Sequence, residues 1–156
     1  MFRVMRRSKQ QISDEECIDI LINAKRGVLA VLGDEDYPYT VPLDYVYSNG
    51  HIYFHSAKSG HKLDAVNRHD KVSFCVLNEG VQEKDDWWYH FISVVVFGRI
   101  RVIEDDAERI EFLRLLGRKY FPTAEMVEDD IKKDAARAEV LDLSIEHMTG
   151  KRVKEN

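Results

Sequence analysis

The order of apolar and polar positions along the chain predicts a protein built mainly from β-strands. Short alternating or fully apolar runs follow one another with turn residues between them, as antiparallel strands do. Fewer stretches repeat their apolar positions every three to four residues, as amphipathic helices do. The predicted strands cover residues 28–32, 37–47, 51–55, 71–77, 87–103 and 139–145, and the predicted helices cover about 13–25, 63–68, 105–120 and 123–137.

This succession favours an antiparallel barrel with peripheral helices over a parallel sheet. At least six strands with hairpin spacing are joined to only three or four helices, whereas parallel strands are usually connected through helices. We therefore expect a mainly β fold, a closed antiparallel β-barrel, in a single domain spanning residues 1–156. Residues 78–86 are expected to form a loop, and residues 146–156 a C-terminal tail.

Four local signals set the details of these elements. Ser13 and Glu16 have the spacing of a capping box, so a helix is expected to begin there. The segment 48–50 (SNG) is typical of a hairpin turn. Pro42 inside the second strand indicates an edge, a bulge, or a place where something other than a strand lies against the backbone. Gly98 indicates a bend in the longest strand.

The candidate chemistry lies in residues 53–63, where an apolar strand runs into glycine, hydroxyls and cations. The serine hydroxyls of this stretch can donate hydrogen bonds, and Gly60 lets a ligand approach the backbone closely. A helix is expected to start here, and its free N–H groups, with the charges of His61 and Lys62, would attract an anion such as a phosphate. The alternative is that these residues only cap a short surface helix.

Composition and charge narrow the choice of partners. The 156 residues are 44% hydrophobic and 33% charged, which is typical of a globular domain with a core. The net charge of −5 disfavours a nucleic acid or an anionic membrane as the main partner, so a small anionic ligand fits better. No apolar run approaches the length of a membrane span, and the basic N-terminus lacks the apolar centre of a signal peptide. We therefore expect a cytoplasmic protein.

Familiar catalytic and metal-binding motifs are absent from the sequence. It contains no G-x-G-x-x-G, P-loop, serine elbow or H-E-x-x-H pattern, which excludes the commonest enzymes recognised by motif. Cys17 and Cys75 lie at positions typical of buried apolar thiols, and no metal-ligand spacing is present, so no metal is expected. The aromatic cluster at residues 87–91 is expected to serve packing or an interface rather than a ligand site.

Four segments of the chain match, in order, the pattern of a known family. They are residues 37–43 (YPYTVPL), 53–62 (YFHSAKSGHK), 93–99 (SVVVFGR) and 145–151 (IEHMTGK). In them the chain resembles the pyridoxamine-phosphate-oxidase-like flavoproteins, and within these the 5-nitroimidazole-resistance branch, over nearly the whole domain. The resemblance implies an FMN-binding split β-barrel, antiparallel and of Greek-key type, in a homodimer with the flavin site at the subunit interface.

The resemblance also implies which residues hold the cofactor, which is FMN with FAD as the alternative. Three consecutive residues of the second strand would lie along the flavin ring, and the residues at the end of the third strand would lie near its ribityl side. The cations after Gly60 would hold the phosphate, and two residues of the longest strand would approach from their own side. The implied cofactor-binding residues are Val41, Pro42, Leu43, His55, Ser56, Ala57, His61, Lys62, Ser93 and Val94.

The chain departs from the family pattern at positions that bear on the substrate. Hydrophobic or hydroxyl residues around Thr40 replace the arginine that the oxidases use for phosphate, and His61 stands where an arginine is usual. The C-terminal Arg-and-Trp substrate signature of true pyridoxamine-phosphate oxidases is not evident. These departures imply weaker binding of phosphate and disfavour vitamin B6 oxidation.

Two kinds of function follow from the resemblance. The first is an FMN-dependent oxidoreductase that acts on a small electron-poor substrate such as a nitroimidazole, with the flavin carrying the redox chemistry. The second is a flavin-binding carrier or sensor without turnover, and pyridoxamine-phosphate-oxidase-like activity is a further alternative. His55 is the candidate catalytic residue, as an acid or an active-site ligand, and the alternative for it is a hydrogen-bonded structural histidine.

Overall fold

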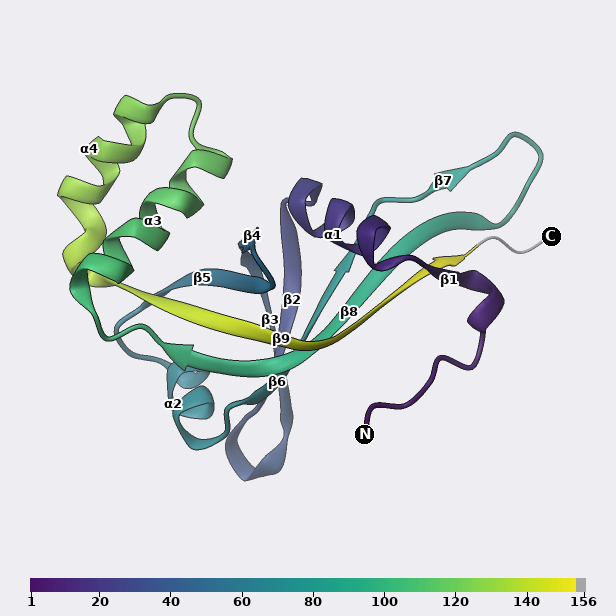
Figure 1. Cartoon of the computed structure of the whole chain (residues 1–156), viewed down its shortest axis with the longest axis horizontal. Coiled ribbons are helices and arrows are strands. Elements are labelled where there is room, and N and C mark those ends of the chain that lie inside the picture. The colour runs from purple at the N-terminus through teal and green to yellow at the C-terminus, as the bar shows by residue number, and fades with distance from the viewer. Residues whose placement is uncertain (154–156) are drawn as a thin grey trace.

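One strongly curled antiparallel sheet forms the body of the protein in the computed structural model, which describes residues 1–153 (Figure 1). Its strands follow the order β3–β2–β6–β8–β9–β5–β4, with β1 paired to β9 and β7 paired to β8. The mainly β, antiparallel architecture predicted from the sequence is confirmed. The strands are β1 (Gln11–Ile12), β2 (Arg26–Leu32), β3 (Pro38–Asp44), β4 (Val46–Ser48), β5 (His51–Ala57), β6 (Lys71–Leu77), β7 (Val81–Gln82), β8 (Tyr89–Val102) and β9 (Ala138–Val153).

Four α-helices and three single 3₁₀ turns surround the sheet in the part of the chain that the structure describes. Figure 1 shows α3 and α4 side by side at one end of the sheet, α1 above its middle, and α2 beneath it. The elements are α1 (Asp14–Asn23), α2 (His61–Arg68), α3 (Asp106–Tyr120), α4 (Ala124–Asp134), η1 (Ser8–Gln10), η2 (Asp34–Asp36) and η3 (Ala135–Arg137).

The barrel is split, because the two strands that end the sheet do not pair with each other. These are β3 and β4, and no ladder joins them within the described residues. β3 carries Pro38 and Pro42, which lack the N–H groups that a further ladder would use, and proline is tolerated in a strand that forms an edge. The expectation of a closed barrel is therefore wrong, and the split barrel implied by the family resemblance is confirmed.

β9 is the strand to which most of the sheet is attached. It pairs with β8 over most of its length, with β5 through its first half and with β1 near its end. The apolar pattern predicts that this strand ends at residue 145, and that boundary is wrong, because the strand continues to Val153. Residues 146–152 are mostly polar, so their alternation carried no apolar signal. The last residues of the predicted tail, 154–156, lie outside the described residues.

A β-bulge between Phe97 and Gly98 bends β8 against β9. Phe97 pairs with His147 and Gly98 pairs with Ile145, so β9 contributes one extra residue at this point. A Cβ atom on Gly98 would lie 2.0 Å from the carbonyl oxygen of Ser144, which only glycine avoids. The bend that the sequence predicts at Gly98 is therefore confirmed.

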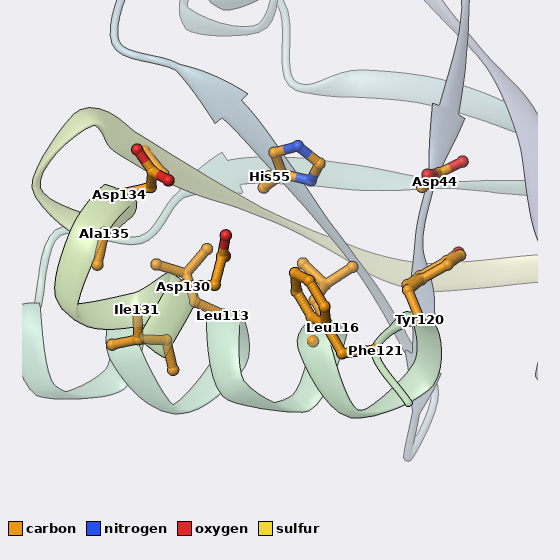
Figure 2. A pocket seen from close by; sticks show the side chains of 12 residues that line it. Asp44, His55, Leu113, Leu116, Tyr120, Phe121, Asp130, Ile131, Asp134 and Ala135 are labelled. Carbon is orange, nitrogen blue, oxygen red and sulfur yellow. The ribbon is translucent and has the colours of Figure 1, made fainter. Parts of the chain in front are cut away.

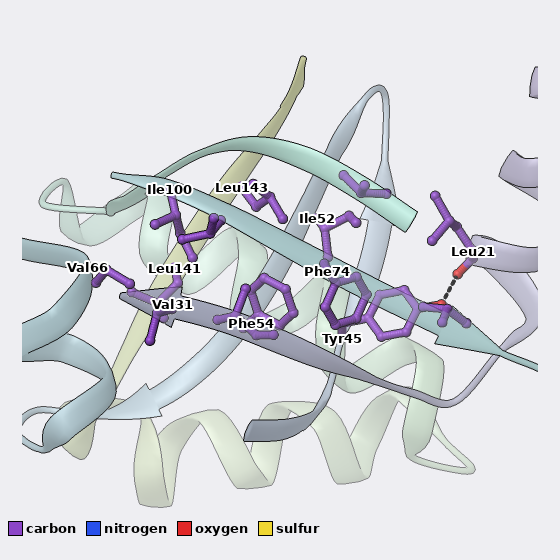
Figure 3. Close-up of a cluster of buried hydrophobic side chains, with 14 of the residues drawn as sticks. Leu21, Val31, Tyr45, Ile52, Phe54, Val66, Phe74, Ile100, Leu141 and Leu143 are labelled. Atoms are coloured by element: carbon purple, nitrogen blue, oxygen red, sulfur yellow. Dashed lines mark hydrogen bonds between the residues drawn. The ribbon is translucent and has the colours of Figure 1, made fainter. Parts of the chain in front are cut away.

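Large apolar side chains fill the interior of the barrel (Figure 3). The Phe74 ring meets the rings of Tyr45 and Phe54 edge to face, with centroids 4.9 and 5.1 Å away. The Tyr45 hydroxyl donates a hydrogen bond of 2.7 Å to the Leu21 carbonyl oxygen, which fixes α1 over one end of the barrel. Tyr45 also separates β3 from β4, so the single strand predicted over residues 37–47 is in fact two strands.

The remaining local signals are confirmed. The Ser13 hydroxyl accepts a hydrogen bond from the Glu16 N–H, and the Glu16 carboxylate accepts one from the Ser13 N–H. Asn49 and Gly50 both have positive φ, as the two-residue turn between β4 and β5 requires. Across residues 1–153, no helix is both long enough and apolar enough to cross a membrane.

Gly98→Ala is expected to destabilise the fold strongly, because the new methyl group would overlap the backbone of β9 rather than a flexible side chain. The free energy of unfolding should fall by about 2–3 kcal/mol in urea denaturation. Gly50→Ala is the control: a Cβ atom there has no heavy atom within 4 Å, and only its positive φ is unfavourable, which costs about 1 kcal/mol. Equal losses in the two variants would contradict the clash.

Candidate functional site

The residues expected along the flavin ring lie on β3, at the open edge of the split barrel. Val41 and Leu43 are half-buried and pack inward against the barrel core, whereas Thr40 and Pro42 are exposed on the outer face. β3 pairs with β2 on one side, and within the described residues it has no strand on the other. A planar ligand at this edge would therefore meet Pro42 and the strand backbone first, with Val41 and Leu43 partly exposed beside them.

Neighbouring residues of β5 point to opposite sides of the sheet. Ser56 is only 6% exposed and lies on the same face as Phe54, toward the barrel interior. His55 and Ala57 are exposed and share the opposite face with Tyr53, which stacks on a phenylalanine of α3. The family resemblance implies that His55 and Ser56 lie together beside the cofactor, but their side chains point toward different surfaces of the sheet.

The start of α2 has the features of an anion site. Gly60 precedes the helix with φ of +136°, a value that favours glycine, and the space beside its Cα is open. The first bond of the helix joins the Asp64 N–H to the Gly60 carbonyl oxygen, so the N–H groups of residues 61–63 have no acceptor in the helix. Lys62 is half-buried, and within the described residues no carboxylate pairs with it. Burial lowers the pKa of its ammonium group.

His61, the other cation expected at the phosphate, is engaged with the turn between β2 and β3. Its Nε2 accepts a hydrogen bond of 3.2 Å from the Asp34 N–H and lies 3.7 Å from the Asp34 carboxylate. Its ring stacks on Tyr39, with centroids 4.2 Å apart. Gly33 permits this approach, because a Cβ atom there would lie 2.9 Å from His61 Nε2. His61 therefore fastens α2 to the barrel, and Lys62 is the uncommitted cation of the first turn.

Ser93 and Val94 lie on β8, three strands from β3 and two strands from β5 in the order of the sheet. Along β9, Ser93 is paired with Lys151 and Ser56 with Glu139, and these two positions are separated by about 40 Å of strand. Val94 is 0% exposed and belongs to the barrel core, so its side chain faces the interior rather than a ligand. Through β6 and β2, however, Val94 is nearly level with Pro42 and Leu43 of β3 across the sheet.

A cavity of about 350 Å³ lies between the strands and the α3–α4 hairpin (Figure 2). His55 faces it from β5, and Asp44 faces it from the end of β3. Figure 2 shows these two side chains on the strand side, opposite the side chains of the two helices. The cavity is lined by Asp44, His55, Leu113, Leu116, Gly117, Tyr120, Phe121, Asp130, Ile131, Asp134, Ala135 and Ala138.

Reasoning from the sequence assigned none of the helical residues of this cavity to a site. Part of the apolar face of α3 packs on the barrel, since Phe112 stacks on Tyr53 with ring centroids 3.8 Å apart. The available signal was on α4, where Asp130 and Asp134 lie one turn apart beside the apolar Ile131. This pair of aspartates could not be recognised as part of a site from the sequence, because the sequence does not show that this turn of α4 faces the same cavity as His55.

Comparison with known proteins places the chain in a family. Residues 13–152 match the family model described as pyridoxamine 5'-phosphate oxidase. The matched range includes the β3 edge, the start of α2 and the cavity beside His55. No curated protein matches the chain.

Solved structures with the same split-barrel fold cover most of the chain. A FAD-binding protein from Mesorhizobium loti is 26% identical, with 92% of this chain and 97% of that chain covered at a TM-score of 0.69. A candidate 5-nitroimidazole antibiotic resistance protein from Bacteroides thetaiotaomicron is 22% identical, with 93% and 90% covered at a TM-score of 0.75. The FAD and heme binding protein from Mycobacterium smegmatis is 20% identical, with 94% and 74% covered at a TM-score of 0.76.

Proposed function

The chain belongs to the pyridoxamine 5'-phosphate oxidase family, and from this premise we propose that it is a flavin-binding oxidoreductase. The proposed cofactor is FMN, with FAD as the alternative, and the proposed substrates are small electron-poor compounds such as nitroimidazoles. The observation that carries the proposal is the half-buried Lys62, which has no carboxylate partner within residues 1–153 and lies at the free N–H groups of the first turn of α2.

The start of α2 suits a phosphate for electrostatic reasons. The helix dipole and the free N–H groups of residues 61–63 attract an anion, and the Lys62 ammonium group adds a full charge. Burial of this ammonium group without a counter-charge is unfavourable, as the lowered pKa of Lys62 indicates. A phosphate bound beside Lys62 would offset that cost, so these residues fit the phosphate of a flavin nucleotide.

The open edge of β3 connects the start of α2 with the cavity. Tyr39, near the beginning of β3, contacts His61, and Asp44, at the end of β3, lines the cavity with His55. When bound, a flavin supplies hydride and electron transfer. The part of this chain is to hold the phosphate at Lys62, to offer the β3 edge to the ring, and to shield a substrate from water with the α3–α4 hairpin. His55 faces that space and can donate a proton there.

The similar structures support both the cofactor and the substrate class. The Mesorhizobium loti protein binds FAD, and the Mycobacterium smegmatis protein binds FAD and heme. The Bacteroides thetaiotaomicron protein is a candidate for 5-nitroimidazole resistance. We therefore favour a flavin as the cofactor of this chain and a nitroimidazole as the first substrate to test.

The cavity disfavours a phosphorylated substrate. Its lining contains three aspartates and one histidine, but no lysine or arginine. The phosphate of pyridoxamine phosphate would need a cation at this place, because Asp130 has no ion-pair partner within residues 1–153 and would repel an anion. An uncharged planar acceptor avoids this repulsion, so it suits the cavity better than a vitamin B6 phosphate does.

Lys62→Met should weaken FMN binding at least about tenfold, because it keeps the apolar stem and removes a charge-assisted contact, a loss of about 1.5–3 kcal/mol. Fluorescence titration of FMN measures the affinity. Lys71→Met is the matched control, since Lys71 is an exposed lysine at the start of β6, beyond the other end of α2. Unchanged FMN affinity in Lys62→Met would contradict the assignment of the phosphate site.

The flavin-loaded protein, reduced without oxygen, should be reoxidised by a 5-nitroimidazole faster than by buffer in a stopped-flow experiment. His55→Gln should slow this reaction at least about tenfold at equal flavin content, because it removes the proton donor at the cavity. Reoxidation at the rate of buffer alone would favour a flavin carrier or sensor. Turnover of pyridoxamine phosphate in air would instead identify an oxidase.

We also propose a homodimer in which the partner subunit completes the flavin site. Ser93 and Ser56 are separated by about 40 Å along β9 in one chain, and we propose that Ser93 contributes to the site of a second copy. The hairpin arm between β6 and β8, which carries β7, projects from the sheet (Figure 1). An exposed apolar surface on a projecting arm suits a subunit interface. The exposed apolar side chains of the arm are Leu77, Val81, Trp87 and Tyr89.

Light scattering at micromolar protein should give twice the 18.2 kDa mass of the chain. Trp87→Ser should shift the protein toward the monomer and weaken FMN binding together, because Trp87 is 74% exposed in one chain and would be covered in the dimer. Met126→Ser on α4 is the control for the loss of an exposed apolar side chain. A monomer that retains its flavin would refute a shared site.

A further inference from the structure

The cavity beside His55 has walls that are fixed by hydrogen bonds. The buried Arg109 of α3 donates from Nη1 to the carbonyl oxygens of Ala135 and Ala138, at 2.5 and 2.8 Å. Arg114 of α3 forms an ion pair with Glu128 of α4, which ties the two helices together. The α3–α4 hairpin is thus held against the sheet, and the cavity is formed before any ligand arrives.

The inner part of the cavity is apolar and sized for a small organic molecule. Leu113 and Leu116 of α3, Phe121 just after it and Ile131 of α4 line it (Figure 2). The volume of about 350 Å³ lies at the lower end of the range for pockets that bind small molecules. An aromatic ring or a short alkyl chain would fit these walls.

All the carboxylates at the cavity come from aspartates, and two of these aspartates already have partners. Asp44 is paired with Arg26 at 2.7 Å, and Asp134 is paired with Arg137. Neither arginine lines the cavity. Asp130 has no ion-pair partner within residues 1–153, so its negative charge is available to a ligand.

Lys119, which directly precedes the cavity residue Tyr120, does not neutralise the charge of Asp130. Lys119 donates from Nζ to the carbonyl oxygen of Ala24 at 2.6 Å, and its Nζ lies 4.0 Å from the centroid of the Tyr45 ring. Its ammonium group is therefore held between α3 and the end of α1, outside the cavity lining. The cavity combines apolar walls with an uncompensated carboxylate.

We propose that this cavity binds small organic cations, with an apolar ring or chain between α3 and α4 and an ammonium group beside Asp130. A carboxylate next to apolar walls gains a charge-assisted hydrogen bond from such a ligand and repels an anion of the same shape. The proposal concerns a site of the chain alone, so it holds whether or not a flavin lies along β3.

Three ligands that share a phenyl ring and differ in charge test the proposal: 2-phenylethylamine, 2-phenylethanol and 3-phenylpropionate. Each is titrated into the full-length ¹⁵N-labelled protein as purified, and the backbone amide shifts are followed by NMR. The amine should give saturable shifts at Leu116, Gly117 and Ala135, which line the cavity. The alcohol should bind roughly threefold more weakly than the amine, and the acid more weakly still.

Asp130→Asn should lower the affinity for the amine by the same factor, roughly threefold, and leave the affinity for the alcohol unchanged. Asp129→Asn is the matched control, because Asp129 is the neighbouring exposed aspartate of α4 and does not line the cavity. Three results would overturn the proposal: equal amine affinities in the two variants, tighter binding of the acid than of the amine, or no saturable shifts at the cavity amides.

Discussion

The pairing of β8 with β9 is the constraint on which the rest of the structure depends. These two long strands share one ladder, and β6, β5, β1 and β7 are each paired directly to one of them. The bulge at Gly98 bends that ladder, so the sheet curls and carries β3 and β5 round toward each other. Because the curl ends without a ladder between β3 and β4 in the described part of the chain, the candidate flavin site lies at a free strand edge rather than inside a sealed barrel.

Side chains of β5 alternate between the two faces of the sheet, so one strand has two different roles. Phe54 and Ser56 face the barrel interior, while Tyr53 and His55 face the α3–α4 hairpin. The stacking of Tyr53 on Phe112 holds α3 against the strand, and His55 then projects into the cavity that remains. The same strand thus stabilises the core with one face and supplies a titratable group to a preformed cavity with the other.

The features that could be predicted from the sequence are those specified over a few neighbouring residues. The capping box at Ser13 and the bend at Gly98 are of this kind, and so is the group of Gly60, a helix start and Lys62. The full length of β9 could not be predicted, because its second half is specified by pairing with β8 rather than by its own apolar pattern. The engagement of His61 with the β2–β3 turn, and the cavity between α3 and β5, depend on contacts between residues distant in sequence, which no local pattern encodes.

The open edge of β3 also affects the tendency of the protein to aggregate. An unpaired strand edge is a template on which a strand of another molecule can add, which is a common route to aggregation. Pro38 and Pro42 deprive such a strand of two hydrogen-bond donors, so the intermolecular ladder would be interrupted twice over the seven residues of β3. The two prolines that accompany the open barrel therefore also act as gatekeepers, because they hinder the addition of a strand from a neighbouring chain at this edge.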